Sequence, residues 1–223
     1  MKKSKSKLPR SWWLTIVMAL AIPASGLAAE AWHPLASEKF ERVSFNGVAP
    51  TVYRAEGESL TMQVDKSAAA LVAGFANARP LHQLRFEWKS SIDGLAASAK
   101  AEESKAGDDA ILRIGLLLAG PAPSVPFFAP AWIKAVGKLM KQGSDRMLYL
   151  TAGSRHAPGQ SWKSPYASSI ENRALAAEPL AEGWQTSQFK SETPLQVVGL
   201  WLMADGDDTR QSFQVQLRNF VWE

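Results

Sequence analysis

The chain has 223 residues and no cysteine. This excludes disulfide bonds and thiolate metal sites, and the length suits one domain preceded by a targeting segment. The formal net charge of +4 arises in residues 1–29, where every charged side chain is basic. The remainder is nearly neutral, which argues against the broad basic surface of a nucleic-acid-binding protein.

Residues 1–29 predict a secretory signal peptide. A basic segment ends at Arg10, an apolar segment spans residues 12–24, and small residues follow. This order is typical of signal peptides, and the apolar segment is shorter than the roughly 20 residues of a membrane span. We expect cleavage between Ala28 and Ala31 and a periplasmic or secreted protein without a stable membrane anchor. The alternative is an uncleaved N-terminal anchor.

Residues 51–89 predict short strands. Glu56-Gly57-Glu58 is typical of a hairpin turn. Apolar and polar residues alternate over 84–89, which predicts a strand with one solvated face. Residues 68–75 are apolar and could form a strand or a helix, because so short a run has no decisive periodicity.

Residues 110–119 are apolar except for Arg113, a pattern that favours a central strand covered on both faces. A buried, unpaired charge is costly, so we expect Arg113 to have a carboxylate partner. Asp108 and Asp109 are the nearest candidates along the chain.

A helix is predicted over residues 131–142. It follows a proline-rich segment, and its apolar residues recur three or four apart while three lysines lie off that stripe. Residues 153–168 contain glycine and proline and predict a long loop.

The C-terminal region predicts a strand, an acidic turn and a returning strand. Residues 195–204 are mostly apolar, residues 205–209 are acidic, and an alternating segment runs to Trp222. The alternation changes parity near Arg218-Asn219, which is consistent with a β-bulge.

Together these segments predict an all-β fold. Short strands with one inserted helix and no alternating βαβ units favour a two-sheet antiparallel sandwich of jelly-roll type. We expect residues 30–223 to form this single domain.

Several motifs, in the same order along residues 40–222, resemble a secreted bacterial family called domain of unknown function 3047. They are Gly107-Asp108-Asp109 before an apolar strand, residues 84–89, Met147-Leu148-Tyr149 after the helix, Trp184, and residues 198–209 with their Asp-x-Asp-x-Thr turn. The resemblance implies a jelly-roll-like sandwich and no established activity.

The acidic turn contains one candidate metal site. Asp205, Asp207 and Thr209 place oxygen atoms at alternate positions, as calcium-binding loops do. Calcium needs six or more oxygens, so Asp108 and Asp109 would have to complete the site. The alternatives are a polar turn, or carboxylates that pair with Arg113 or Arg210. No other cofactor is expected.

Aromatic residues in and after the long loop suggest a ligand-binding site. Arg155, Trp162 and Tyr166 combine flat rings with a hydrogen-bonding group, as sugar-binding sites do, and Trp184 is a further candidate. The alternative is that the aromatic residues anchor the loop to the domain.

The predicted function is a non-enzymatic module that binds a glycan or another envelope ligand. One alternative is a polysaccharide-active enzyme that uses Asp108, Asp109, Asp205 or Asp207. Another is a structural or protein-interaction domain of the cell envelope.

Overall fold

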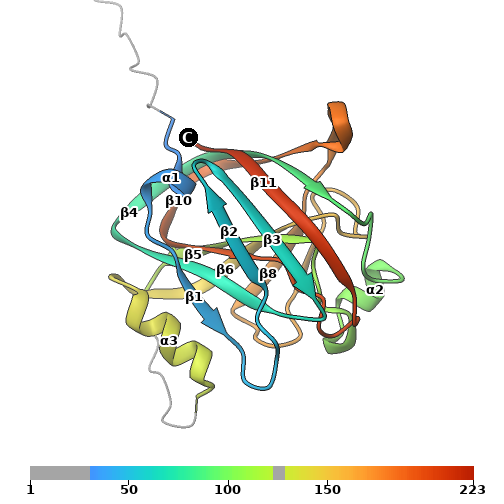
Figure 1. The fold of residues 1–223 in the computed structure, drawn as a ribbon. Coiled ribbons are helices and arrows are strands. Elements are labelled where there is room, and N and C mark those ends of the chain that lie inside the picture. Colours follow the sequence, from blue (N-terminus) through green and yellow to red (C-terminus); the bar gives the residue numbers. More distant parts are fainter. Residues whose placement is uncertain (1–30, 123–128) are drawn as a thin grey trace, which may run out of the picture.

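The computed structural model describes residues 31–122 and 129–223, so the predicted signal peptide lies outside the described residues. The described chain is mostly strand, which confirms the all-β prediction (Figure 1). The strands are β1 (Glu41–Ser44), β2 (Val52–Glu56), β3 (Ser59–Asp65), β4 (Ala69–Ser90), β5 (Leu112–Ala119), β6 (Ser144–Ala152), β7 (Ser161–Lys163), β8 (Ile170–Ala174), β9 (Glu178–Pro179), β10 (Gln185–Met203) and β11 (Ser212–Trp222). The helices are α1 (Pro34–Ser37), α2 (Ala99–Glu102), η1 (Lys105–Gly107), α3 (Ala131–Leu139) and η2 (Ala181–Gly183).

All strands belong to one hydrogen-bonded sheet. The main path runs β2-β3-β11-β4-β10-β5-β6-β8-β7, while β1 pairs with β4 and β9 pairs with β10. The pairings are antiparallel except for β6 with β8, which run parallel. The sheet is therefore mixed, whereas the sequence predicted purely antiparallel pairing.

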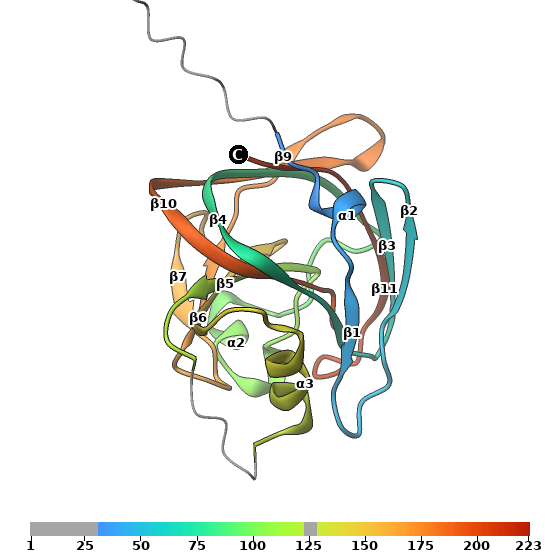
Figure 2. The same cartoon turned by 90° about the vertical axis from the view of Figure 1, so that its left-hand side faces the viewer.

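Two long strands divide this sheet into two layers. Residues 70–74 of β4 pair with 199–203 of β10, and residues 84–88 of β4 pair with 185–189 of β10. Between these segments the register shifts, and both strands turn sharply at the upper left of Figure 2. Such bends let one strand serve two packed layers. The arrangement is consistent with the predicted sandwich, although the layers share strands.

We call the two halves layer A and layer B. Layer A contains β1, the first half of β4, the second half of β10, β5, β6, β8 and β7. Layer B contains β2, β3, β11, the second half of β4, the first half of β10 and β9.

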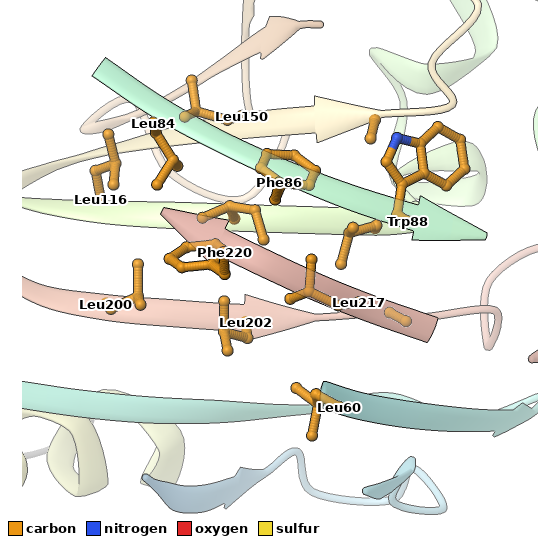
Figure 3. Packing of buried hydrophobic residues seen from close by; sticks show 14 of the residues in the cluster. Leu60, Leu84, Phe86, Trp88, Leu116, Leu150, Leu200, Leu202, Leu217 and Phe220 are labelled. Carbon is orange, nitrogen blue, oxygen red and sulfur yellow. The ribbon is translucent and has the colours of Figure 1, made fainter. Parts of the chain in front are cut away.

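The main hydrophobic core lies between the layers (Figure 3). Leu200 and Leu202 reach it from layer A, and Phe86 and Leu217 reach it from layer B. Phe86 also stacks on Phe220, with 6.0 Å between ring centroids. The predicted strand at residues 84–89 is confirmed as part of β4, with its alternate apolar residues buried.

Helix α3 covers a second apolar cluster, on the outer face of layer A. Its Trp132, Val136 and Leu139 pack against this cluster, which includes Val72 and Trp201. The predicted helix is thus confirmed, although it ends at Leu139, three residues earlier than expected.

The acidic segment after β10 does not form a hairpin loop. Strand β4 lies between β10 and β11 in the sheet, so the predicted returning strand pairs elsewhere. The segment is anchored by hydrogen bonds from Asp205 N to Ala110 O and from Gly206 N to Ser67 O. The predicted irregularity in the last strand is confirmed, since the register shifts between Arg218 and Val221.

Within residues 31–122 and 129–223, no helix has the length and apolar character that crossing a membrane requires.

The contact between α3 and layer A generates a stability prediction. A Cβ atom at Gly74 would overlap the Leu139 carbonyl oxygen, whereas a Cβ atom at Gly137, in the same helix, would have no neighbour within 4 Å. Gly74→Ala should therefore lower the free energy of unfolding by about 1–3 kcal/mol. Gly137→Ala should raise it by about 0.5–1 kcal/mol, because alanine favours the helix. Urea unfolding of both variants measures this, and equal stabilities would contradict the packing described.

Candidate functional site

A buried arginine lies at the centre of the candidate site. Arg113 is on β5, in the interior of layer A, and is only 4% exposed. Its Nη2 donates to the Asp108 carbonyl oxygen at 3.1 Å and to Asp108 Oδ1 at 3.3 Å. Its Nη1 lies 3.6 Å from Asp205 Oδ2. The expected pairing of Arg113 with a nearby carboxylate is therefore confirmed, and a second carboxylate joins it.

Sheet register explains why Asp205 reaches this arginine. Met203, the last residue of β10, pairs with Arg113 on β5. Asp205 is two residues further on, beside the start of β5, where its Oδ1 accepts from Ala110 N at 2.9 Å. The ion pair thus joins segments that are about 90 residues apart in the sequence.

The remaining acidic residues gather beside this ion pair. Asp109 accepts hydrogen bonds from Asp208 N at 3.3 Å and from Thr209 N at 2.6 Å, which fixes the acidic segment after β10. One carboxylate oxygen from each of Asp109, Asp205 and Asp207 lies within 4.8 Å of the others. Two sequence segments with no local relation therefore form one acidic cluster.

A pocket of about 350 Å³ opens above the buried charges. Such a volume lies at the small end of ligand pockets, which span roughly 300–1,000 Å³. It is lined by Phe45, Asn46, Val48, Ala68, Asp108, Arg113, Pro130, Trp132, Tyr149, Ser164, Tyr166, Ile170, Trp201, Met203, Asp205, Asp207 and Asp208. The walls are thus aromatic and apolar, and the charged residues are one arginine and four aspartates.

The aromatic walls are held by close packing. The Trp132 and Trp201 rings meet edge to face with centroids 6.1 Å apart, and Phe45 meets Trp132 in the same way at 6.0 Å. Gly115 lies behind them, and a Cβ atom there would come within 2.9 Å of both Trp201 and Tyr149. Glycine at this position leaves room for the Trp201 Cβ atom and the edge of the Tyr149 ring.

Burial and mutual repulsion disturb the titration of these carboxyl groups. Burial, followed by the charges of Asp109 and Asp208, raises the pKa of Asp207 to about 6. Burial also raises the pKa values of Asp108, Asp205 and Asp208. Arg113 opposes the rise at Asp108 and Asp205, but burial outweighs it. The pocket therefore holds carboxylates that are costly to keep charged.

Two buried N–H donors of pocket-lining residues have no acceptor among the described residues. They are Arg113 Nε and Trp201 Nε1, on side chains that are 4% and 1% exposed. A buried donor without a partner costs about 1–3 kcal/mol.

The pocket brings together some of the predicted site residues. Asp205 and Asp207 line it, and Tyr166 lies at it with 54% of its surface exposed. The Tyr166 hydroxyl donates to Asp208 Oδ2 at 3.0 Å, which connects the long loop to the acidic segment. Thr209 lies beside the pocket residues but is not part of the lining.

Three other predicted binding residues are not in the pocket lining. Trp162 is on β7, is 8% exposed, and stacks on His156 with ring centroids 3.9 Å apart. Arg155 donates from its backbone N to Glu102 and from Nε to the Ala96 carbonyl oxygen. Trp184 precedes β10 in layer B, with the Arg218 guanidinium 3.7 Å above its ring.

Several pocket residues could not be recognised from the sequence. Trp132 and Trp201 belong to an amphipathic helix and an apolar strand, where they look like ordinary core residues. Their role as walls depends on the outer face of layer A being only partly covered, which no local pattern records.

Calcium binding stays a prediction. Asp205 and Asp207 lie close to Asp109, and Thr209 donates its backbone N–H to Asp109 while its buried Oγ1 has no hydrogen-bond partner among the described residues. Asp205 also accepts from Ala110 N and pairs with Arg113. An ion here would draw on Asp109, Asp205 and Asp207 and would need further oxygens to reach six ligands.

The buried ion pair generates a second stability prediction. Arg113→Met keeps the aliphatic length of the side chain but removes the charge that Asp108 and Asp205 face. At pH 7 the free energy of unfolding should fall by about 3–5 kcal/mol.

The pH dependence of this loss has a definite sign. The pKa values of both carboxyl groups are raised in the folded protein, and without Arg113 they rise further. Their contribution to stability is present below about pH 4 and is lost as the pH rises through the folded pKa values. The defect should therefore shrink at pH 4. Urea unfolding at both pH values measures it, with Arg54→Met on exposed β2 as the control. A loss independent of pH would contradict this account.

Comparisons with known proteins identify the family to which the chain belongs. A search of curated proteins found no match. Among solved structures, the enzymatically active domain of Bacteriophage CBA120 tailspike protein 4 aligns with 85% of this chain and 20% of its own, at 9% identity and a TM-score of 0.37. The alignment thus spans one fifth of the tailspike chain, and we draw no conclusion from so low a TM-score. The family model described as Protein of unknown function (DUF3047) matches residues 31–221, so the chain belongs to that family.

Proposed function

We propose that this protein is an exported, non-enzymatic module that binds one sugar residue of an envelope glycan in the pocket above Arg113. The observation that supports this most directly is the mixture of groups in the lining. Aromatic rings and the carboxyl groups of four aspartates surround the same small volume.

Sugars match this mixture better than most small molecules. A pyranose has an apolar face that can pack on Trp132 or Tyr166. Each of its hydroxyl groups can donate to a carboxylate and accept from an N–H group. A purely apolar ligand would leave the aspartates of the lining without hydrogen-bond donors, and an anionic ligand would face four of them.

Binding depends on Tyr166 in this proposal. Tyr166→Ala removes an exposed ring from the pocket edge with little effect on folding, since the side chain is 54% exposed. The affinity for the bound sugar should fall about tenfold, the equivalent of one aromatic contact. Calorimetric titration with neutral, N-acetylated, amino and acidic mono- and disaccharides measures this.

The matched control is Trp184→Ala, which removes an aromatic ring that lies away from the pocket lining. It should bind as the parent protein does. If the parent protein binds no sugar in the panel, the proposed function is wrong.

A polysaccharide-active enzyme is a second candidate, and the properties of Asp207 favour it. Its pKa is raised to about 6, a value suited to a general acid near neutral pH. An oxygen of Asp109 and one of Asp205 lie within 4.8 Å of an oxygen of Asp207. In this candidate Asp207 would donate a proton to the leaving glycosidic oxygen while an ionised neighbour attacks the sugar as nucleophile, since so short a separation is closest to that of retaining enzymes; water would then hydrolyse the sugar–enzyme bond.

The enzyme candidate predicts turnover that binding alone does not. Release of reducing ends from a bound oligosaccharide should be measurable, and Asp207→Asn should lower the rate at least about a hundredfold because it removes the proton donor. Prolonged incubation with a ligand that binds but is recovered intact would exclude this candidate and leave the binding module.

A further inference from the structure

A second hollow lies on the outer face of layer A, between α3 and residues of β5, β6 and β8, and we call it the α3 groove. Its volume is about 630 Å³, within the roughly 300–1,000 Å³ of small-molecule sites. Trp132 and Ile170 line both this groove and the candidate pocket, so the two hollows are neighbours. None of the four aspartates that line the candidate pocket lines the α3 groove. The groove is therefore a separate site with different chemistry.

Sheet register builds the floor of the α3 groove. Leu117 on β5 pairs with Met147 on β6, and Met147 pairs with Ile170 on β8. Residues directly opposite each other in neighbouring strands point to the same face of a sheet. The three apolar side chains thus form one row across three strands, on the face that α3 partly covers.

Helix α3 supplies an apolar wall. Ile133, Val136 and the following Met140 are three or four residues apart, and all three line the groove. Every residue of α3 nevertheless stays at least partly exposed, including the apolar ones. An amphipathic helix normally buries its apolar stripe. The wall therefore keeps apolar surface that a bound hydrocarbon would remove from water.

The position of α3 is fixed by contacts at its C-terminal end. The Leu139 carbonyl oxygen lies so close to Gly74 that a Cβ atom there would overlap it. Just beyond the helix, Gln142 Nε2 donates to the Ala76 carbonyl oxygen at 2.8 Å. The helix end cannot move closer to the sheet, so the groove cannot close there.

Basic side chains predominate in this part of the chain. Residues 110–170 contain seven lysines and arginines but one acidic residue, Asp145. Asp145 Oδ1 lies 3.5 Å from Arg146 Nε, so that carboxylate already has a cation. Lys141 lines the groove, is exposed, and makes no ion pair with any residue that the structure describes. The ligand charge that complements this groove is therefore negative.

We infer that the α3 groove binds a long-chain fatty acid. Its hydrocarbon chain covers the row formed by Leu117, Met147 and Ile170, and its carboxylate pairs with Lys141. An uncharged hydrocarbon would gain nothing from Lys141, and a cationic amphiphile would be repelled by it. The inference does not rest on the proposed sugar pocket, and failure of either proposal leaves the other standing.

Calorimetric titration with single-chain amphiphiles, each below its micelle concentration, tests the inference. Dodecanoate should bind at least about tenfold more tightly than octanoate, because each CH₂ group that is fully buried strengthens binding about fourfold. It should bind about threefold more tightly than dodecyltrimethylammonium, which has the same chain and the opposite charge. The factor is small because an exposed ion pair contributes little.

One pair of variants locates the hydrocarbon chain. Ile133→Asp places a charge in the apolar wall and should weaken dodecanoate binding at least about tenfold. Ala131→Asp adds the same charge to α3 at an exposed position outside the groove lining. This control should bind within about twofold of the parent protein.

A second pair of variants locates the carboxylate. Lys141→Gln should weaken dodecanoate binding about threefold and should not weaken binding of dodecyltrimethylammonium. Lys190→Gln, at an exposed position of layer B, is the control and should change neither. Thermal unfolding of each variant shows whether the fold is retained, and Lys141→Gln decides the matter if Ile133→Asp unfolds.

Four outcomes would overturn the inference. The first is that dodecanoate does not bind, and the second is that it binds no more tightly than octanoate or dodecyltrimethylammonium. The third is that neither Ile133→Asp nor Lys141→Gln weakens its binding. The fourth is that an acidic amphipathic peptide binds more tightly than dodecanoate and loses its affinity in Ile133→Asp, since the groove would then be a docking site for a protein helix.

Discussion

The position of one buried charge determines the geometry of this end of the molecule. Arg113 lies in a strand that is otherwise apolar, so the fold must bring carboxylates to it or lose several kcal/mol. Asp108 is supplied locally, and Asp205 is supplied by the register between β10 and β5. The segment after β10 is thereby held against the start of β5, and this contact forms the base of the pocket.

The pocket exists because the two faces of layer A are covered differently. Its inner face is sealed by layer B, with Leu200 and Leu202 fully buried in the main core. Its outer face is covered by α3, a nine-residue helix, and by short connecting segments. A single short helix covers only part of such a face, so aromatic rings and the polar strand ends next to them line a hollow instead of a sealed core.

The sequence predicts those features that depend on the spacing and charge of residues close together in the chain. The alternation over residues 84–89, the helix beginning at residue 131 and the need of Arg113 for a carboxylate all follow from spacing and charge, and the structure contains each. The bent strands could not be predicted, because β4 and β10 become continuous only through pairing with each other. The pocket likewise depends on residues from β5, β10, α3 and the long loop, whose proximity no local pattern records.

The unpaired groups of the pocket are difficult to explain by folding alone. Arg113 is held through its two terminal nitrogens, which leaves Nε without an acceptor. The acidic segment is held by the backbone amides of Asp208 and Thr209, which donate to Asp109. A pocket selected only for stability would replace such donors and acceptors by apolar groups or let them pair. Groups kept at a local cost in stability are typical of functional sites.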